Sequence, residues 1–178
     1  MPDEPSEEPR HIVLVGSMGA GKTSVGRILA QRLGRPLRDS DEWILEQTGR
    51  TVRRLRREIG VDGMHRFEAG HLRRALSEST PSIVAAAASI VDDPECRAAL
   101  AQPGIATVWL RARPETLARR FDSSAHRPAF GEDPDRFLAA QAAARYPELE
   151  AISQVVVDVD DANPAETAEA VLTKLGLS

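Results

Sequence analysis

The feature that most constrains the fold of this chain is a glycine-rich segment, residues 16–23, with the sequence GSMGAGKT. It matches the pattern G-x-x-x-x-G-K-[ST] in full. An apolar run at residues 11–15 precedes it and apolar side chains at helical spacing follow it, which predicts a buried strand before the loop and an α-helix after it. A strand, a glycine loop and a helix N-terminus in this order form an anion site, because the loop N–H groups point inward and the helix dipole adds partial positive charge.

This loop predicts a site for the phosphates of ATP, with Mg²⁺ as the accompanying metal. Lys22 occupies the position from which an ammonium group reaches the β- and γ-phosphates, and the hydroxyl of Thr23 occupies the position that ligates Mg²⁺. A glycine-rich turn without a ligand is the alternative, and the flanking strand and helix argue against it. The expected nucleotide-binding residues of this segment are Gly16, Ser17, Met18, Gly19, Ala20, Gly21, Lys22, Thr23 and Ser24.

The composition narrows the class of protein and of partner. A chain of 178 residues is long enough for one domain with a substantial core, and we expect that domain to span residues 11–178 after a disordered, acidic leader at 1–10. The net charge of −4 argues against binding to nucleic acid or to an anionic membrane. The single cysteine, Cys96, excludes an internal disulfide and fits a reducing compartment, so we expect a cytoplasmic protein.

Strand and helix patterns alternate along the chain. The expected strands are 11–15, 36–38, 82–86, 105–110 and 155–157, and helices are expected near 22–33, 41–47, 51–59, 64–79, 94–100, 115–120, 135–146 and from 164 onward. Ser40 is the expected N-cap of the second helix, and Gly60 and Gly63 are expected to separate the third helix from the fourth. This alternation predicts an α/β fold with a five-stranded parallel sheet covered by helices on both faces.

Ligands of such folds bind at the carboxyl ends of the strands. This rule brings the phosphate loop together with Asp39 and Asp41, which follow the second strand, and with residues 87–89, which follow the third. The polar segment at residues 122–134, interrupted by glycine and proline, is expected to be a mobile lid. His71 has no partner at metal-ligand spacing and is expected to be an ordinary surface residue.

Three further motifs give the chain a family resemblance: Asp39-Ser40-Asp41 after the second strand, Arg127-Pro128 in the expected lid, and Arg145-Tyr146-Pro147. With the phosphate loop, they make the chain similar to shikimate kinases over about residues 12–172. These are small P-loop enzymes that move the γ-phosphoryl group of ATP to the 3-hydroxyl of shikimate. The resemblance implies a P-loop NTPase-type three-layer α/β/α sandwich and a small hydroxylated acceptor.

The resemblance also implies roles for the residues of these motifs. Asp39 lies near the hydrated Mg²⁺ with Thr23, whereas Asp41 holds the acceptor hydroxyls and orients the one that attacks. Arg127 closes over the transferring phosphoryl group, so Lys22, Asp41 and Arg127 are the expected catalytic residues. This division suits phosphoryl transfer, which depends on positioning and on charge stabilisation.

Three more positions follow from the same resemblance. Arg145 is expected to hold the carboxylate of shikimate. Arg120 and Pro164 are expected to lie on either side of the adenine ring, and a cation over a purine face is physically reasonable. An exposed arginine without a ligand remains the alternative for Arg120.

Two positions depart from the family pattern. The helix that carries Phe-Arg in the family has Met64-His65, and Ala87-Ala88-Ser89 replaces a triple glycine after the third strand. A histidine lacks the planar fork of an arginine and is only partly charged at neutral pH, so the second arm of the carboxylate clamp is altered. Methyl groups at Ala87 and Ala88 fill space and restrict φ. The expected acceptor-binding residues are Asp41, His65, Ala87, Ala88 and Arg145.

The sequence therefore predicts a monomeric kinase that uses MgATP on shikimate. Two alternatives stay open at this point. One is a kinase for a related polyol or cyclitol acid, accepted by a reshaped pocket. The other is a nucleotide-binding module with little transfer activity, which intact Lys22, Thr23, Asp41 and Arg127 argue against.

Overall fold

The computed structural model describes residues 8–122 and 134–177. Its strands are β1 (His11–Val15), β2 (Leu37–Asp39), β3 (Ser82–Ala85), β4 (Ile105–Arg111) and β5 (Val155–Asp158). Its helices are α1 (Lys22–Leu33), α2 (Ser40–Thr48), α3 (Val52–Ser77), the 3₁₀ turn η1 (Ala88–Asp92), α4 (Pro94–Leu100), α5 (Pro114–Asp122), α6 (Pro134–Ile152) and α7 (Pro164–Leu175).

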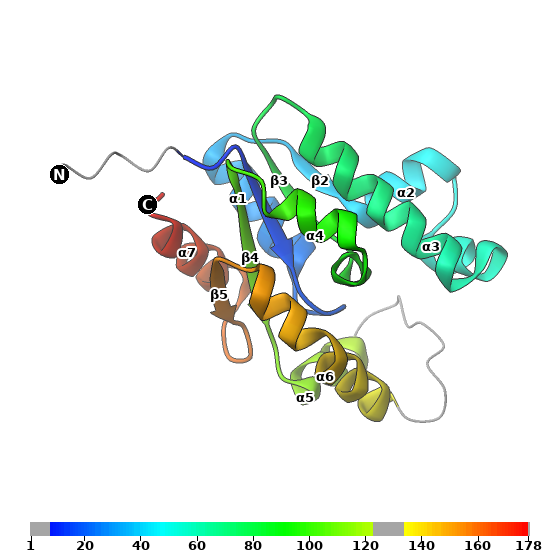
Figure 1. Cartoon of the computed structure of the whole chain (residues 1–178). Helices are drawn as coiled ribbons and strands as arrows, with labels where there is room; N and C mark the ends of the chain where they lie inside the picture. Colours follow the sequence, from blue (N-terminus) through cyan, green and yellow to red (C-terminus); the bar gives the residue numbers. More distant parts are fainter. Residues whose placement is uncertain (1–7, 123–133, 178) are drawn as a thin grey trace.

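The five strands form one all-parallel sheet in the order β2-β3-β1-β4-β5. Helices α1 and α7 cover one face of it, and α3, α4 and α6 cover the other (Figure 1). Each face has its own buried apolar cluster, with Leu14 and Leu110 pointing to the first and Val13 and Trp109 to the second. This is the predicted three-layer α/β/α architecture, and the alternation of side chains along β1 and β4 explains how both faces are filled.

Strand β1 lies at the centre, between β3 and β4, so the loop that follows it leaves the sheet at its middle. Because all strands are parallel, the segments after β1, β2 and β3 emerge at the same edge. Figure 1 shows the hairpin of α2 and α3 extending beyond the sheet on one side and α5 and α6 on the other. The predicted phosphate loop, Asp39 and Asp41, and residues 87–89 therefore all follow strands at this edge.

The start of α2 differs from the prediction. Ser40 is not the N-cap, because Asp39 holds that position and accepts hydrogen bonds from the backbone N–H groups of Asp41 and Glu42. Ser40 is buried, and its hydroxyl has no hydrogen-bond partner within the described residues. A carboxylate at the N-cap is also the better electrostatic match for a helix N-terminus.

Helices α3 and α6 are longer than predicted. Only Gly60 interrupts α3, with φ 74° and ψ −179°, whereas Gly63 stays within the helix and packs closely against Ile59. Helix α6 runs to Ile152, past the predicted end at Tyr146, and holds Pro147 inside it. The predicted break at Gly63 and the predicted end at Tyr146 were therefore wrong.

The beginning of the described chain is tied to the domain. Arg35 donates a hydrogen bond to the carbonyl of Pro9 (2.7 Å) and forms an ion pair with Glu8 (3.1 Å). The remainder of the predicted leader lies outside the described residues.

Candidate active site

The phosphate loop is held against the sheet by a close backbone approach at Gly16. Its φ is 143°, and a Cβ atom built there would lie 2.6 Å from the carbonyl oxygen of Leu110. Any side chain would therefore collide with backbone that cannot move without disturbing β4. Gly21, with φ 93°, then turns the chain into α1, which begins at Lys22. Gly16 and Gly21 fix the curl that points loop N–H groups toward an anion.

Lys22 is folded onto its own loop. Its ammonium group donates to the carbonyls of Gly16 (2.7 Å) and Ser17 (3.1 Å). Burial lowers the pKa of Lys22 to about 8, against the opposing charges of Asp41 and Asp39. An ammonium that is held only by carbonyl dipoles is available to an incoming phosphate, whose charge would stabilise its protonated form.

Asp39 joins the predicted metal site to the predicted acceptor site. One carboxylate oxygen accepts from the hydroxyl of Thr23 (2.6 Å), and the other accepts from the backbone N–H of Asp41 (2.9 Å). Asp39 is only 5% exposed, so its carboxylate is fixed from both sides. Thr23 and Asp39 supply the oxygen donors that Mg²⁺ prefers, which fits the predicted pair of protein groups.

A metal held by these residues would take most of its ligands from water and phosphate. Within residues 8–122 and 134–177, no cluster of three or more histidine, cysteine, aspartate or glutamate side chains could hold a metal ion. Mg²⁺ in phosphoryl-transfer sites ordinarily keeps several waters and binds one or two protein groups, so the donor set suits it. When bound, the ion would neutralise charge on the β- and γ-phosphates.

Glu68 of α3 lies beside the predicted acceptor residues, and the sequence analysis missed it. It accepts a hydrogen bond from the hydroxyl of Ser89, at the turn after β3. Burial raises the pKa of Glu68, and the charge of Asp41 raises it further, whereas the Ser89 hydrogen bond and the charge of His65 lower it. The spacing of three residues between His65 and Glu68 places both on one helix face, and that spacing was a usable sequence signal.

His65 lies where the family resemblance placed an arm of the carboxylate clamp. It is partly buried on α3, and its charge acts on Glu68. Asp41, at the start of α2, acts on both Glu68 and Lys22. Lys22, Asp41, His65 and Glu68 come from three different helices, and the structure brings them close enough for their charges to act on one another.

The alanine turn after β3 takes an ordinary backbone conformation. Ala87 has φ −65° and ψ 154°, and none of the described non-glycine residues has a positive φ. The predicted restriction of φ by methyl groups is therefore not an effect at Ala87, since any residue adopts this conformation. Ala87 and Ala88 are both partly exposed, so the effect of their methyl groups on an acceptor is limited to the space that they fill.

Arg145 lies on α6 and pairs with Asp92 at the end of η1. Its guanidinium donates to the carboxylate of Asp92 through Nη2 (2.8 Å) and Nε (3.2 Å). The charge of Arg145 lowers the pKa of Lys22 and of Glu68, after the larger effect of burial on each. Arg145 therefore lies within electrostatic reach of both the phosphate loop and the acceptor site.

A hollow of about 300 Å³ lies beside the phosphate loop. The two predicted adenine-binding residues, Arg120 and Pro164, both line it together with loop residues. Arg120 donates to the carbonyls of Gly19 (3.2 Å) and Val159 (2.6 Å), which fixes its guanidinium between the loop and the segment before α7. The full lining is Gly19, Ala20, Gly21, Ser24, Val25, Arg120, Val159, Ala162, Pro164 and Thr167.

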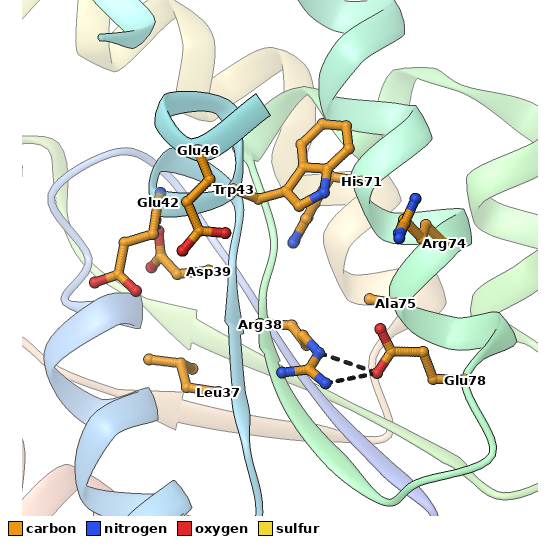
Figure 2. A pocket seen from close by; sticks show the side chains of 10 residues that line it. All are labelled: Leu37, Arg38, Asp39, Glu42, Trp43, Glu46, His71, Arg74, Ala75 and Glu78. Atoms are coloured by element: carbon orange, nitrogen blue, oxygen red, sulfur yellow. Dashed lines mark hydrogen bonds and ion pairs between the residues drawn. The ribbon is translucent and has the colours of Figure 1, made fainter. Parts of the chain in front are cut away.

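A smaller hollow of about 120 Å³ lies on the outer side of β2, and Figure 2 shows it closed by Trp43 above and by the Arg38–Glu78 ion pair below. Asp39, which lines this hollow, also accepts the hydrogen bond from Thr23 of the phosphate loop. His71 lies beneath Trp43, with ring centroids 5.5 Å apart, and is 2% exposed, so the expected surface position was wrong. Burial lowers the pKa of His71 to about 4, which keeps the ring neutral at neutral pH.

The predicted roles of Arg127 and of the lid concern a segment that the structure does not describe. Arg127 and most of the predicted lid fall within residues 123–133, outside the described residues. In the part of the chain that the structure does describe, no helix combines the length and the apolar character needed to cross a membrane.

Comparisons with known proteins agree with this geometry. The family model for shikimate kinase matches residues 18–176. A shikimate kinase of Caulobacter vibrioides (strain NA1000 / CB15N) is 39% identical over 165 residues, which cover 92% of this chain and 81% of that protein. One of Symbiobacterium thermophilum is 38% identical over 168 residues, covering 93% and 95%. A solved structure of shikimate kinase from Acinetobacter baumannii in complex with shikimate superposes with a TM-score of 0.86 at 28% identity, over 94% of this chain and 93% of that one. A family model that matches most of the chain, together with relatives that are 38–39% identical over more than nine-tenths of it, shows that the chain belongs to the shikimate kinase family.

Proposed function

We propose that this protein is a kinase that transfers the γ-phosphoryl group of MgATP to the 3-hydroxyl of shikimate, yielding shikimate 3-phosphate and ADP. The observation that carries the proposal is the proximity of Lys22, Asp41 and Arg145: the charges of Asp41 and Arg145 both act on the Lys22 ammonium, which follows the central strand β1. These supply a charge for the transferring group, a carboxylate for the attacking hydroxyl and a cation for the acceptor's carboxylate. The family relationship supports the same acceptor.

Each of these groups has a task that its surroundings allow. The ammonium of Lys22 stabilises charge on the γ-phosphoryl oxygens, because it is buried and already close to the loop carbonyls. The carboxylate of Asp41 accepts a hydrogen bond from the acceptor hydroxyl and so orients its oxygen toward the γ-phosphorus. Arg145 holds the acceptor at its other end, so the hydroxyl cannot turn away from the reacting group.

A second acceptor class has its own supporting observation. His65 stands where, by the family resemblance, a second arginine would hold a carboxylate, and it lies close enough to Glu68 for its charge to act on that carboxyl. A cyclic hydroxy acid with a less demanding carboxylate contact would suit this site.

We place the enzyme in the cytoplasm as a monomer that binds neither nucleic acid nor membrane. The net charge of −4 and the single, buried Cys96 support this placement.

The test is acceptor-dependent release of ADP from MgATP, measured with shikimate, quinate and related polyols at equal concentrations. We expect release above the acceptor-free rate with shikimate, and a 3-phosphate product by NMR. ADP release with quinate or a polyol but not with shikimate would move the assignment to the second acceptor class. Nucleotide binding without acceptor-dependent release from any member of the set would contradict the kinase proposal.

A further inference from the structure

Arg145 and Asp92 form an ordered pair at the edge of the acceptor site. The Nη2 and Nε atoms of Arg145 lie 2.8 and 3.2 Å from the same carboxylate oxygen of Asp92, and Nε lies 3.5 Å from the other. Two N–H groups on one edge of the guanidinium are therefore engaged. The Arg145 side chain is 15% exposed, so the pair is shielded on the arginine side.

The opposite edge of the guanidinium is left for a ligand. Among the described residues, the Nη1 group of Arg145 has no hydrogen-bond partner. A guanidinium offers five N–H donors in a fixed plane, so a carboxylate can bind the Nη edge while Asp92 keeps the Nε edge. The charge of Arg145 acts on Lys22 and Glu68, so the guanidinium lies within electrostatic reach of both.

The two residues come from segments that pack together for other reasons. Asp92 is the last residue of η1, the turn that follows the alanine run after β3, and Arg145 lies in α6. Ala87 and Tyr146 both pack on the buried cluster on this face of the sheet, which fixes the two backbones relative to each other. The position of the Asp92 carboxylate is thus set by the fold, and not by a long flexible side chain.

We propose that Asp92 is a positioning residue for acceptor binding: it holds Arg145 so that the free edge of its guanidinium meets the acceptor's carboxylate. This inference rests on the proposed function. It assigns to the clamp a residue that does not touch the acceptor itself.

Pre-ordering matters more in this chain than in one with two arginine arms. An arginine side chain loses considerable rotamer freedom when it is fixed, and a partner that fixes it beforehand removes that cost from the binding step. Because His65 stands in place of the second arm, Arg145 carries most of the charge-assisted contact to the carboxylate. Loss of its orientation is therefore not compensated by a neighbouring cation at position 65.

The opposite role makes the opposite prediction. If Asp92 only competed with the acceptor for the guanidinium, its removal would free Arg145 and lower the KM for the acceptor. A positioning role requires a higher KM after removal. The direction in which the KM for the acceptor changes therefore distinguishes a positioning role of Asp92 from a competing role.

The experiment compares Asp92→Ala, Asp92→Asn and Asp92→Glu with the unaltered protein in steady-state kinetics. We expect the KM for shikimate to rise about fivefold to tenfold in Asp92→Ala, because a long side chain must then be ordered at binding. Asp92→Asn should give a smaller rise and Asp92→Glu the smallest, since they keep one or two acceptor oxygens. The kcat and the KM for ATP should stay within about twofold, as expected for a residue remote from the phosphates.

Asp158→Asn is the matched control. Asp158 pairs with Arg111 through two hydrogen bonds of 2.6 and 2.9 Å, so it makes a comparable ion pair, but one at the far edge of the sheet. We expect no change in the KM for shikimate in this variant. The comparison removes any general effect of losing one surface carboxylate.

A neutral acceptor supplies a readout that a purely structural role would not move. Methyl shikimate lacks the charged carboxylate, so its binding should not depend on Asp92. We expect its affinity, measured by calorimetry with ADP present, to be the same in the unaltered protein and in Asp92→Ala. Arg145→Ala should likewise abolish the effect of Asp92→Ala on shikimate affinity, as in a double-mutant cycle.

Three results overturn the inference: an unchanged KM for shikimate in Asp92→Ala, a lower KM, or an equal loss of affinity for methyl shikimate. Each of these leaves the proposed function intact, provided that the unaltered protein turns over shikimate. If the unaltered protein neither binds nor phosphorylates shikimate, the proposed function fails first and the inference fails with it. The wild-type assay therefore separates the two failures.

Discussion

The nucleotide half and the acceptor half of this site are built in different ways. The core of the nucleotide half is one continuous segment, residues 16–24, whose shape is dictated by glycines and by contact with β4, and Arg120 and Pro164 join it from farther along the chain. The acceptor half gathers side chains from α2, α3, η1 and α6, and only tertiary packing brings them together. A contiguous loop keeps its chemistry wherever its backbone is kept, whereas a dispersed pocket can be altered one side chain at a time. The two departures from the family motifs noted in the sequence, Met64-His65 and Ala87-Ala88-Ser89, both fall in the predicted acceptor half.

The largest effect is expected from the nucleotide half. Lys22→Ala should reduce kcat by roughly a hundredfold to a thousandfold, because it removes a preorganised charge aimed at the transferring oxygens. The fold should remain, since the lysine bonds only to loop carbonyls. Lys174→Ala, an exposed lysine of α7, is the control and should leave kcat unchanged. Full activity in Lys22→Ala would remove the basis for treating this half as the catalytic one.

The lid should give the next largest effect. Arg127→Ala is expected to lower kcat by about a hundredfold and to weaken ADP binding only severalfold, because a lid arginine acts mainly on the transition state. Steady-state kinetics and calorimetry with ADP separate the two parameters. Arg119→Ala, on the exposed side of α5, is the control. Equal losses in kcat and in ADP affinity would mean that Arg127 contributes to nucleotide binding in the ground state as much as to the transition state.

The third prediction probes the acceptor half. His65→Arg should raise shikimate affinity about tenfold to a hundredfold, because it restores a charge-assisted contact to the carboxylate. ATP affinity should not change. His65→Gln, which supplies neither a fork nor a charge, should not produce the gain. If His65→Arg lowers shikimate affinity, the altered pocket is suited to another acceptor, and the second acceptor class gains support.

The same prediction extends to the alanine turn, with a smaller expected change. Ala87→Gly and Ala88→Gly, added to His65→Arg, remove two methyl groups but need no new backbone conformation, since Ala87 already has φ −65°. We expect at most a few-fold further gain, measured as the KM for shikimate. A large gain would show that the methyl groups crowd the acceptor strongly.

The smallest expected effect is the uptake of protons by Lys22 when ADP binds. Burial lowers the pKa of Lys22 to about 8, so part of the population is neutral at pH 8.5. Bound phosphates favour the charged form, so ADP binding at that pH should take up roughly half a proton or more. Calorimetry in buffers of different ionisation enthalpy measures this uptake, which should fade toward pH 7 and be absent in Lys22→Ala. Uptake that persists in Lys22→Ala would come from another group.

The sequence predicted local features well and long-range contacts poorly. The loop, the buried strands and the paired aspartates could be found because each is signalled by neighbouring residues. Ser40 was mistaken for a cap because serine and aspartate are equally good N-caps and only the tertiary position of Asp39 decides between them. His71 was predicted to lie on the surface because no residue near it in the sequence indicates that Trp43 packs over its ring.

The acceptor site shows the same limit. Glu68 could have been found, since it lies one helical turn after His65. Asp92 could not, because 53 residues separate it from Arg145 and no sequence spacing links η1 to α6. The role of Arg127 stays a prediction, as do the assignments of nucleotide and acceptor contacts.

The two oxygens of Asp39 have a consequence for how such enzymes change their substrates. One oxygen holds Thr23 and the other anchors the start of α2, which carries Asp41. Asp39 therefore fixes the separation between the Thr23 hydroxyl, which is predicted to bind the metal, and Asp41, whose carboxylate is predicted to steer the nucleophile. Mutations on α3 and α6 can reshape the far wall of the pocket without moving this reaction axis. A lineage can thus exchange one acceptor for another while the line of attack on the phosphorus stays the same.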